Sequence, residues 1–239
     1  MENISTPIII LFLLTVLATV LLFFKATHYS RTVIIIMAIW IILQTTLGIA
    51  GFYTNWSSVP PRFPLMIVPP VLCIVVLLIL PRGRRFLDAV DLRTLTILHI
   101  IRVPIEITLL YLLVAKLIPE SMTFEGSNFD ILSGITAPIV YFLVFRAKKL
   151  SYRFLLAWNF ICLALLLNVV ITAILSAKTP FQQLAFDQPN IGVTYFPFTL
   201  LAAVVVPIVM LSHVAAIRQL VWKKNAVDTF KIAAATKAY

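Results

Sequence analysis

Charged residues are scarce in this chain. They make up 12% of its 239 residues, about half the share that is usual in a soluble domain. Hydrophobic residues make up 62%, and the mean hydropathy is +1.05. This composition argues against a soluble globular fold and predicts a protein that works within a lipid bilayer. No polar connection exceeds about 20 residues, so we expect one transmembrane domain spanning residues 1–239.

Cysteine, histidine and glycine are also few. Cys73 and Cys162 both lie in apolar stretches without the spacing of a zinc site. Three histidines are too few for a metal-dependent lipid hydrolase with several His and Asp ligands, and no P-loop, HExxH or GxSxG motif occurs. An enzyme is therefore the less favoured interpretation. The six glycines and short connections are typical of a compact protein of the bacterial inner membrane, so we expect the plasma membrane as the location.

Long apolar runs dominate the sequence. Crossing the hydrocarbon core takes roughly 20 mostly apolar residues in a helix. Seven runs meet or approach this length, at residues 7–24, 33–53, 64–80, 94–117, 131–145, 154–176 and 194–221. The first run follows no positively charged segment and precedes no cleavage site, so we expect a retained helix rather than a signal peptide. The predicted fold class is all-α, a polytopic bundle of about seven transmembrane helices.

Lysine and arginine alternate strongly between the two sides of these runs. One side holds 3 of them (Arg62, Lys116 and Lys178), and the other holds 15, from Lys25 to Lys237. Because connections rich in Lys and Arg stay in the cytoplasm, this asymmetry places the N-terminus outside and the C-terminus inside. The net charge of +10 is then explained by the Lys and Arg residues that set the orientation in the membrane. We therefore expect the lipid bilayer, not nucleic acid, as the partner.

The fourth run carries the only charges deep in an apolar segment. His99, Arg102 and Glu106 fall within about 60° of one another on a helix, so they form one polar stripe. Each charge costs roughly 2.5–3.5 kcal/mol in the membrane, so such residues face the interior and by default indicate function. Pro104 removes a backbone donor and predicts a kink in this segment. Arg102 and Glu106, four residues apart, are close enough to pair directly.

This stripe predicts a protein that binds, senses or translocates a small polar ligand, an ion or a proton. Its expected companions are Gln44, Asn159 and Asn168; the two asparagines are nine residues apart and point to opposite faces, so at most one reaches the same cavity. Acidic and amide residues in the outer connections predict a mouth that attracts cations, formed by Glu125, Asn128, Asp130 and Asp187.

Two alternatives stay open. His99 and His213 lie at similar depth on different helices, which is the arrangement of a b-type haem with two axial histidines. The Arg102–Glu106 pair also suits a scaffold subunit in which it only fastens helices together. Pro138, Pro197 and Pro207 predict further kinks in the fifth and seventh helices.

Overall fold

The computed structural model describes the backbone of residues 4–236 and the side chains of residues 4–221. Residues 1–3 and 237–239, including the tail cation Lys237, lie outside the described residues. Helices account for 73% of the chain, and the described residues contain no strand. The predicted all-helical class is therefore confirmed.

Within the described part of the chain, five segments are long and apolar enough to cross a membrane. They are α1 (Thr6–Ala26), α2 (Arg31–Ile49), the α5–α6 segment Leu92–Val114, α8 (Tyr152–Leu175) and Leu201–Val221, which contains the start of α9 (Val206–Thr236). A bent pair, α3 (Pro64–Ile79) and α4 (Pro81–Ala89), counts as a sixth if it is one span. The apolar segment Ile131–Arg146 is shorter and comprises α7 (Ile131–Tyr141) and the π-helical turn η4 (Phe142–Arg146).

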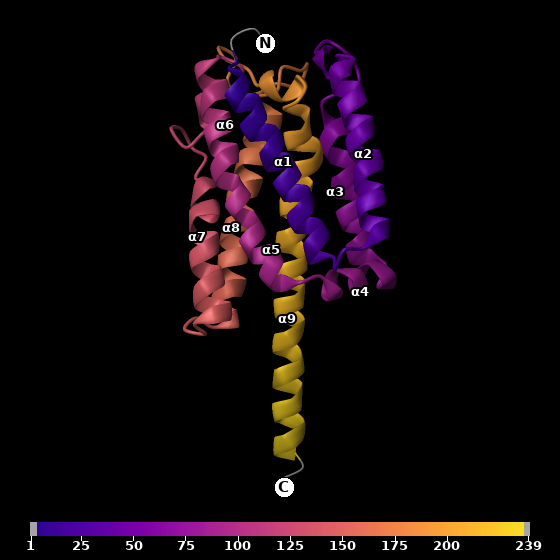
Figure 1. Cartoon of the computed structure of the whole chain (residues 1–239), viewed down its shortest axis with the longest axis vertical. Helices are drawn as coiled ribbons and strands as arrows, with labels where there is room; N and C mark the ends of the chain where they lie inside the picture. The colour runs from indigo at the N-terminus through magenta and orange to yellow at the C-terminus, as the bar shows by residue number, and fades with distance from the viewer. Residues whose placement is uncertain (1–3, 237–239) are drawn as a thin grey trace.

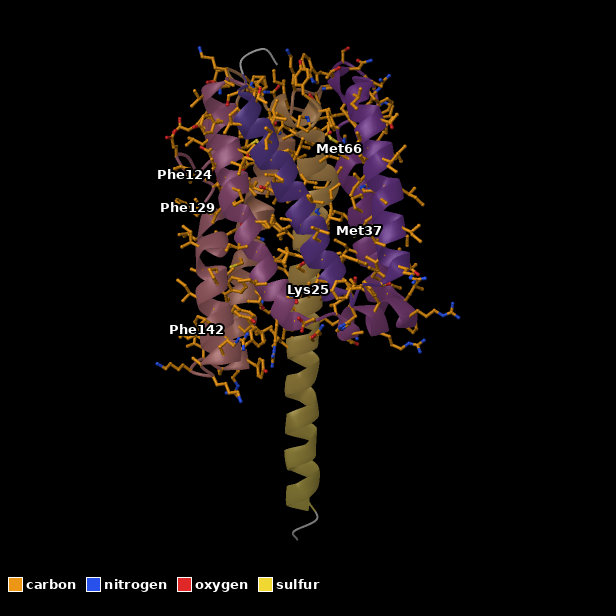
Figure 2. All side chains as sticks on the ribbon, in the orientation of Figure 1. Lys25, Met37, Met66, Phe124, Phe129 and Phe142 are labelled. Carbon is orange, nitrogen blue, oxygen red and sulfur yellow. The ribbon has the colours of Figure 1, made fainter. Side chains whose placement is uncertain are left out.

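The helices form one upright bundle around α9. In Figure 1, α1 crosses in front of α9, α7 and α8 lie on one side, and α2 and α3 lie on the other. Exposed apolar side chains cover the outside: Phe129 and Phe142, labelled along the α7 side in Figure 2, are 54% and 57% exposed. An apolar exterior of this kind suits lipid rather than water.

The chain turns sharply between α3 and α4, whose axes meet at 98°. Leu80 between them adopts an extended conformation, as expected for a residue that precedes proline, here Pro81. On α4, Arg82, Arg84 and Arg85 are exposed while Leu87 is buried. This amphipathic pattern suits a helix lying across the end of the bundle, where Figure 1 places α4.

The predicted break around Pro104 is present. A 3₁₀ turn, η2 (His99–Ile101), separates α5 (Leu92–Leu98) from α6 (Arg102–Val114). Proline at position 104 has no N–H to donate to the carbonyl of Ile100, and its ring crowds that carbonyl, so the α-helical pattern is locally lost. The tighter turn sets His99 and Arg102 at the junction of the two helices, where both are buried.

A second proline break involves α2 and α9. The π-helical turn η6 (Leu201–Val205) precedes Pro207, which cannot donate to the carbonyl of Ala203. The indole Nε1 of Trp40 on α2 donates to that carbonyl at 2.8 Å. A neighbouring helix thus satisfies the group that proline frees, as broken helices in membranes require.

Side chains of α9 fasten the α4 end of the bundle. Gln219 donates to the carbonyls of Leu87 and Val90, at 2.8 Å each, and Arg218 pairs with Asp88 at 2.8 Å. Asp91 caps α5 by accepting from the backbone N–H of Thr94 at 2.9 Å and from its hydroxyl at 2.6 Å. We call this group, comprising residues 87–91, Thr94, Arg218 and Gln219, the α4–α9 clasp.

Hydrogen bonding in this clasp also affects the titration of Asp91. Burial alone would raise the pKa of Asp91, but the hydrogen bonds from Thr94 and the backbone outweigh it, so the pKa lies below its usual value. The capped helix end therefore favours the ionised form of the Asp91 side chain.

Candidate functional site

The candidate site is built on the first turn of α6, which carries two charged residues into the core. Arg102 is 3% exposed and Glu106 is 2% exposed. Both lie on the inner face because the η2 turn and the four-residue spacing aim them into the bundle.

Arg102 is held by three other helical segments. Its Nη1 forms an ion pair with Asp130, which immediately precedes α7, and also donates to the carbonyl of Cys162 on α8 at 3.3 Å. Its Nη2 lies 2.8 Å from Nε2 of His213 on α9. A guanidinium has several donors in a fixed fork and is suited to such shared contacts. The predicted direct pair with Glu106 is wrong, because Asp130 is the carboxylate that pairs with Arg102.

The same contacts fix the tautomer of His213. A guanidinium only donates, so Nε2 of His213 must accept from Arg102, and Nδ1 must carry the proton. That Nδ1 lies 2.9 Å from Oδ1 of Asn159, which accepts it, while the Asn159 amide donates to the carbonyl of Leu155 at 2.9 Å. Both nitrogens of His213 are therefore used within the bundle.

His99 lies flat against His213. The two ring centroids are 3.9 Å apart with an interplanar angle of 11°, and Trp158 contacts the His99 ring edge-on at 5.6 Å. Two histidines that ligate one haem iron point a nitrogen at the metal from opposite sides, with the macrocycle between them. Stacked rings leave no such gap, and both His213 nitrogens are occupied, so these residues do not fit the haem alternative. Among the described residues, no group of three or more His, Cys, Asp or Glu side chains is placed to hold a metal ion.

Glu106 is bound from the connection between α6 and α7. The amide of Asn128 donates to Glu106 Oε1 at 2.6 Å and to the carbonyl of Met122 at 2.9 Å, and Oδ1 of Asn128 accepts from the backbone N–H of Asp130 at 2.9 Å. These contacts complete what we call the Arg102 network: Arg102, Glu106, Asn128, Asp130, Asn159 and His213. It runs as one hydrogen-bonded row from α8 and α9 through α6 to the folded-in connection.

The α7 helix approaches this row very closely at Gly134. A Cβ atom at that position would lie 2.9 Å from a methyl group of Val103 and 3.2 Å from Cβ of Arg102. Only glycine fits this contact without a shift of either helix. The approach places Asp130, one turn earlier, within reach of Arg102.

Three polar atoms in or beside the network have no hydrogen-bond partner among the residues whose side chains the structure describes. Oε2 of Glu106, Nε of Arg102 and Nδ1 of His99 are buried and form no hydrogen bond. Leaving a buried donor or acceptor unpaired costs about 1–3 kcal/mol, and more for a charged group. Such a cost calls for an explanation in terms of function or of a bound molecule.

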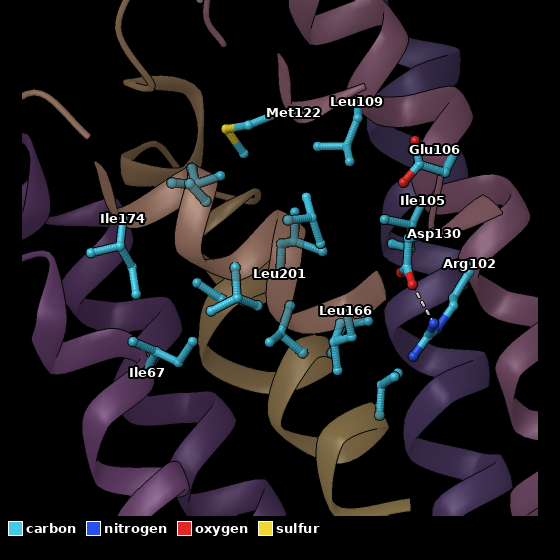
Figure 3. Close-up of a pocket in the computed structure, with 18 of the residues that line it drawn as sticks. Ile67, Arg102, Ile105, Glu106, Leu109, Met122, Asp130, Leu166, Ile174 and Leu201 are labelled. Carbon is cyan, nitrogen blue, oxygen red and sulfur yellow. Dashed lines mark hydrogen bonds and ion pairs between the residues drawn. The ribbon is translucent and has the colours of Figure 1, made fainter. Parts of the chain in front are cut away.

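A cavity lies beside Arg102 and Glu106. It offers about 70 Å³ of space to water-sized molecules, and 17 of its 20 lining residues are apolar. The three others are Arg102, Glu106 and Asp130. Figure 3 shows these three along one wall, with Ile67, Ile174 and Leu201 across the cavity from them. The cavity is partly open, and Ile174, one of the residues that line it, is 42% exposed.

The other predicted site residues lie elsewhere. Gln44 is buried but accepts a hydrogen bond from the hydroxyl of Tyr53 at 2.7 Å, away from the cavity lining. Asn168 is exposed and donates to the carbonyl of Ser127 at 3.0 Å, while Glu125 and Asp187 are exposed on the connections that follow α6 and α8. The predicted outer mouth is therefore divided: Asn128 and Asp130 are 0% and 5% exposed and belong to the buried network.

Sequence reasoning missed the pairing of Asp130 with Arg102. The two residues are 28 positions apart, and helical spacing gives no information about contacts at that separation. The available signal was the pattern Asn128-Phe129-Asp130 directly before an unusually short apolar run, which suggests that the connection folds into the bundle.

The helical bundle, its long apolar helices and its buried ionisable network are together typical of a helical membrane protein. More particularly, the chain belongs to the family described as "Domain of unknown function (DUF8737)", which matches residues 62–221 and so includes the whole Arg102 network. Comparison with curated proteins and with solved structures found no match in either set.

Proposed function

We propose that the chain is a plasma-membrane protein with seven spans, an external N-terminus and a cytoplasmic C-terminus. In this arrangement the bent α3–α4 pair and the short Ile131–Arg146 segment each cross the bilayer beside the five longer spans. The distribution of cations supports it, since Arg82, Arg84 and Arg85 are exposed on α4 and Lys25 lies at the same end of the bundle (Figure 2). The whole chain is then one transmembrane domain.

Within that domain, the proposed function is non-enzymatic binding of a small ligand at the Arg102 network. The observation that carries it is the unpaired Oε2 of Glu106 on the wall of a partly open cavity. A carboxyl oxygen kept buried without a donor is unfavourable in the empty protein, and a ligand that contacts it removes this cost. Sensing or translocation would use the same binding step.

Native mass spectrometry of the purified protein tests this function. The wild-type protein is compared with Glu106→Leu, and with Glu125→Leu as the matched control because Glu125 is an exposed glutamate of the outer connection. We expect the wild type and the control to carry a bound molecule of one constant mass. Glu106→Leu should lack this adduct. If all three proteins carry the same adducts, or none, the proposed ligand site is wrong.

One observation favours the scaffold alternative. Arg102 contacts the segments of α7, α8 and α9 at once, as a residue that fastens helices together would. A scaffold role predicts that every network substitution lowers stability, including Glu106→Gln, which keeps both the shape and the Asn128 hydrogen bond. Ligand binding predicts that Glu106→Gln is tolerated, so thermal unfolding of this variant separates the two functions.

A further inference from the structure

The lining of the cavity indicates the kind of ligand that it would hold. Its 17 apolar lining residues surround only three polar ones, all on the α6 side. A free ion or a fully polar molecule would lose its hydration against such walls without replacement. The ligand therefore needs an apolar body for most of its contacts and a polar group at one end only.

The unpaired atoms restrict the chemistry of that polar end. Glu106 Oε2 and Arg102 Nε are both buried, unpartnered and on residues that line the cavity. Arginine Nε–H only donates, whereas a carboxyl oxygen accepts when ionised and donates when protonated. A hydroxyl group both donates and accepts, so it can satisfy either atom. The charge of Arg102 is already matched by Asp130, which leaves no uncompensated positive charge for an anionic group.

The position of the opening indicates the route of entry. Ile67 of α3 and Ile174 of α8 both line the side of the cavity that faces Arg102 and Glu106 (Figure 3), and α3 packs mainly against α4, η6 and α9 rather than against α8. Apolar side chains are exposed at this place: Ile174 is 42% exposed, and Val68, next to Ile67 on α3, is 44% exposed. An apolar rim at this place faces the hydrocarbon of a bilayer if these helices are spans.

We propose that the cavity binds a neutral amphiphile that enters from the bilayer between α3 and α8 and places a hydroxyl group against Glu106 Oε2. This inference rests on the proposed function and names its ligand class. A membrane-dissolved alcohol has the required apolar body and the single polar end.

Photolabelling in lipid nanodiscs tests the proposal. The probe is a long-chain primary alcohol with a diazirine in its chain, compared with the matched hydrocarbon, carboxylate and primary amine. We expect cavity residues of α8 and α9 to be labelled about tenfold more by the alcohol than by the hydrocarbon, the effect of about one hydrogen bond to a charged group. Glu106→Leu should bring the alcohol down to the level of the hydrocarbon.

Cavity-filling variants keep the test decisive if Glu106→Leu does not fold. Ala173→Phe places a ring in the cavity and should abolish labelling there, whereas Ile171→Phe, two residues away on the exposed face of α8, should leave it unchanged. Equal labelling by alcohol and hydrocarbon, or absence of cavity labelling by every probe, overturns the proposal. Stronger labelling by the amine or the carboxylate overturns the hydroxyl assignment while the ligand site itself stands.

Discussion

Gln219 and Asp91 of the α4–α9 clasp differ from the Arg102 network in how completely their hydrogen bonding is satisfied. In the clasp, the amide of Gln219 donates to two carbonyls and Asp91 accepts two hydrogen bonds from Thr94. In the network, Glu106 and Arg102 line the cavity and each keep an atom without a partner among the described residues. Paired polar groups such as Gln219 and Asp91 are expected in a connection that only holds helices together. Unpaired polar groups beside a cavity, as in the network, are expected in a binding site without its ligand.

Substitution of Arg102 should have the largest effect. Arg102→Leu leaves the Asp130 carboxylate buried without its counter-charge and removes the donor to His213, so we expect a loss of about 3–5 kcal/mol in stability. Thermal unfolding and the yield of monodisperse protein in detergent measure it. The control is Arg82→Leu on the exposed face of α4, which should change stability by less than about 0.5 kcal/mol. Similar unfolding of both variants would show that the network does not hold the helices.

The clasp should respond next. Gln219→Leu leaves the carbonyls of Leu87 and Val90 without their donor, which should cost about 1–3 kcal/mol. Unfolding by heat in detergent measures the loss, with Gln183→Leu on the exposed outer connection as the control. Photolabelling of the cavity should be unchanged in both variants, because neither residue lines it; a loss of labelling in Gln219→Leu would show that the clasp affects the cavity.

A smaller effect is expected at Asp91. Asp91→Ala removes the helix cap and should cost about 1 kcal/mol. Because the pKa of Asp91 is lower in the folded protein, its stabilising effect is present above its unfolded pKa, about 3.9, and is lost as the pH falls through the folded pKa. Unfolding of the wild type and Asp91→Asn from about pH 7 to about pH 3 measures this. The difference in stability between the two proteins should shrink as the pH falls. A difference that grows on acidification would contradict the lowered pKa of Asp91 in the folded protein.

The helical class and the α6 stripe could be predicted because both depend on local pattern. Apolar runs of about 20 residues indicate spans, and the spacing of Arg102 and Glu106 places them on one face whatever surrounds them. Pro104 likewise predicts a break in its own helix, and η2 lies there.

Contacts between distant segments could not be predicted in this way. The Asp130 pair depends on an outer connection folding inward, and the Trp40 hydrogen bond to Ala203 depends on which helix lies beside Pro207. The separation of Gln44 and Asn168 from the cavity depends on the rotation of α2 and α8 in the bundle. Helical periodicity does not determine that rotation when apolar residues surround the whole helix.

The thermal stability of Glu106→Gln tests most directly whether Glu106 serves binding rather than folding. Glutamine keeps the oxygen that accepts from Asn128 and replaces the unpaired oxygen with an amide nitrogen, without a formal charge. We predict an unfolding temperature equal to or above that of the wild type, measured in the same detergent without added ligand, because the fold gains nothing from the unpaired oxygen. A decrease as large as that of Gln219→Leu would contradict this account and assign Glu106 to the structure of the bundle.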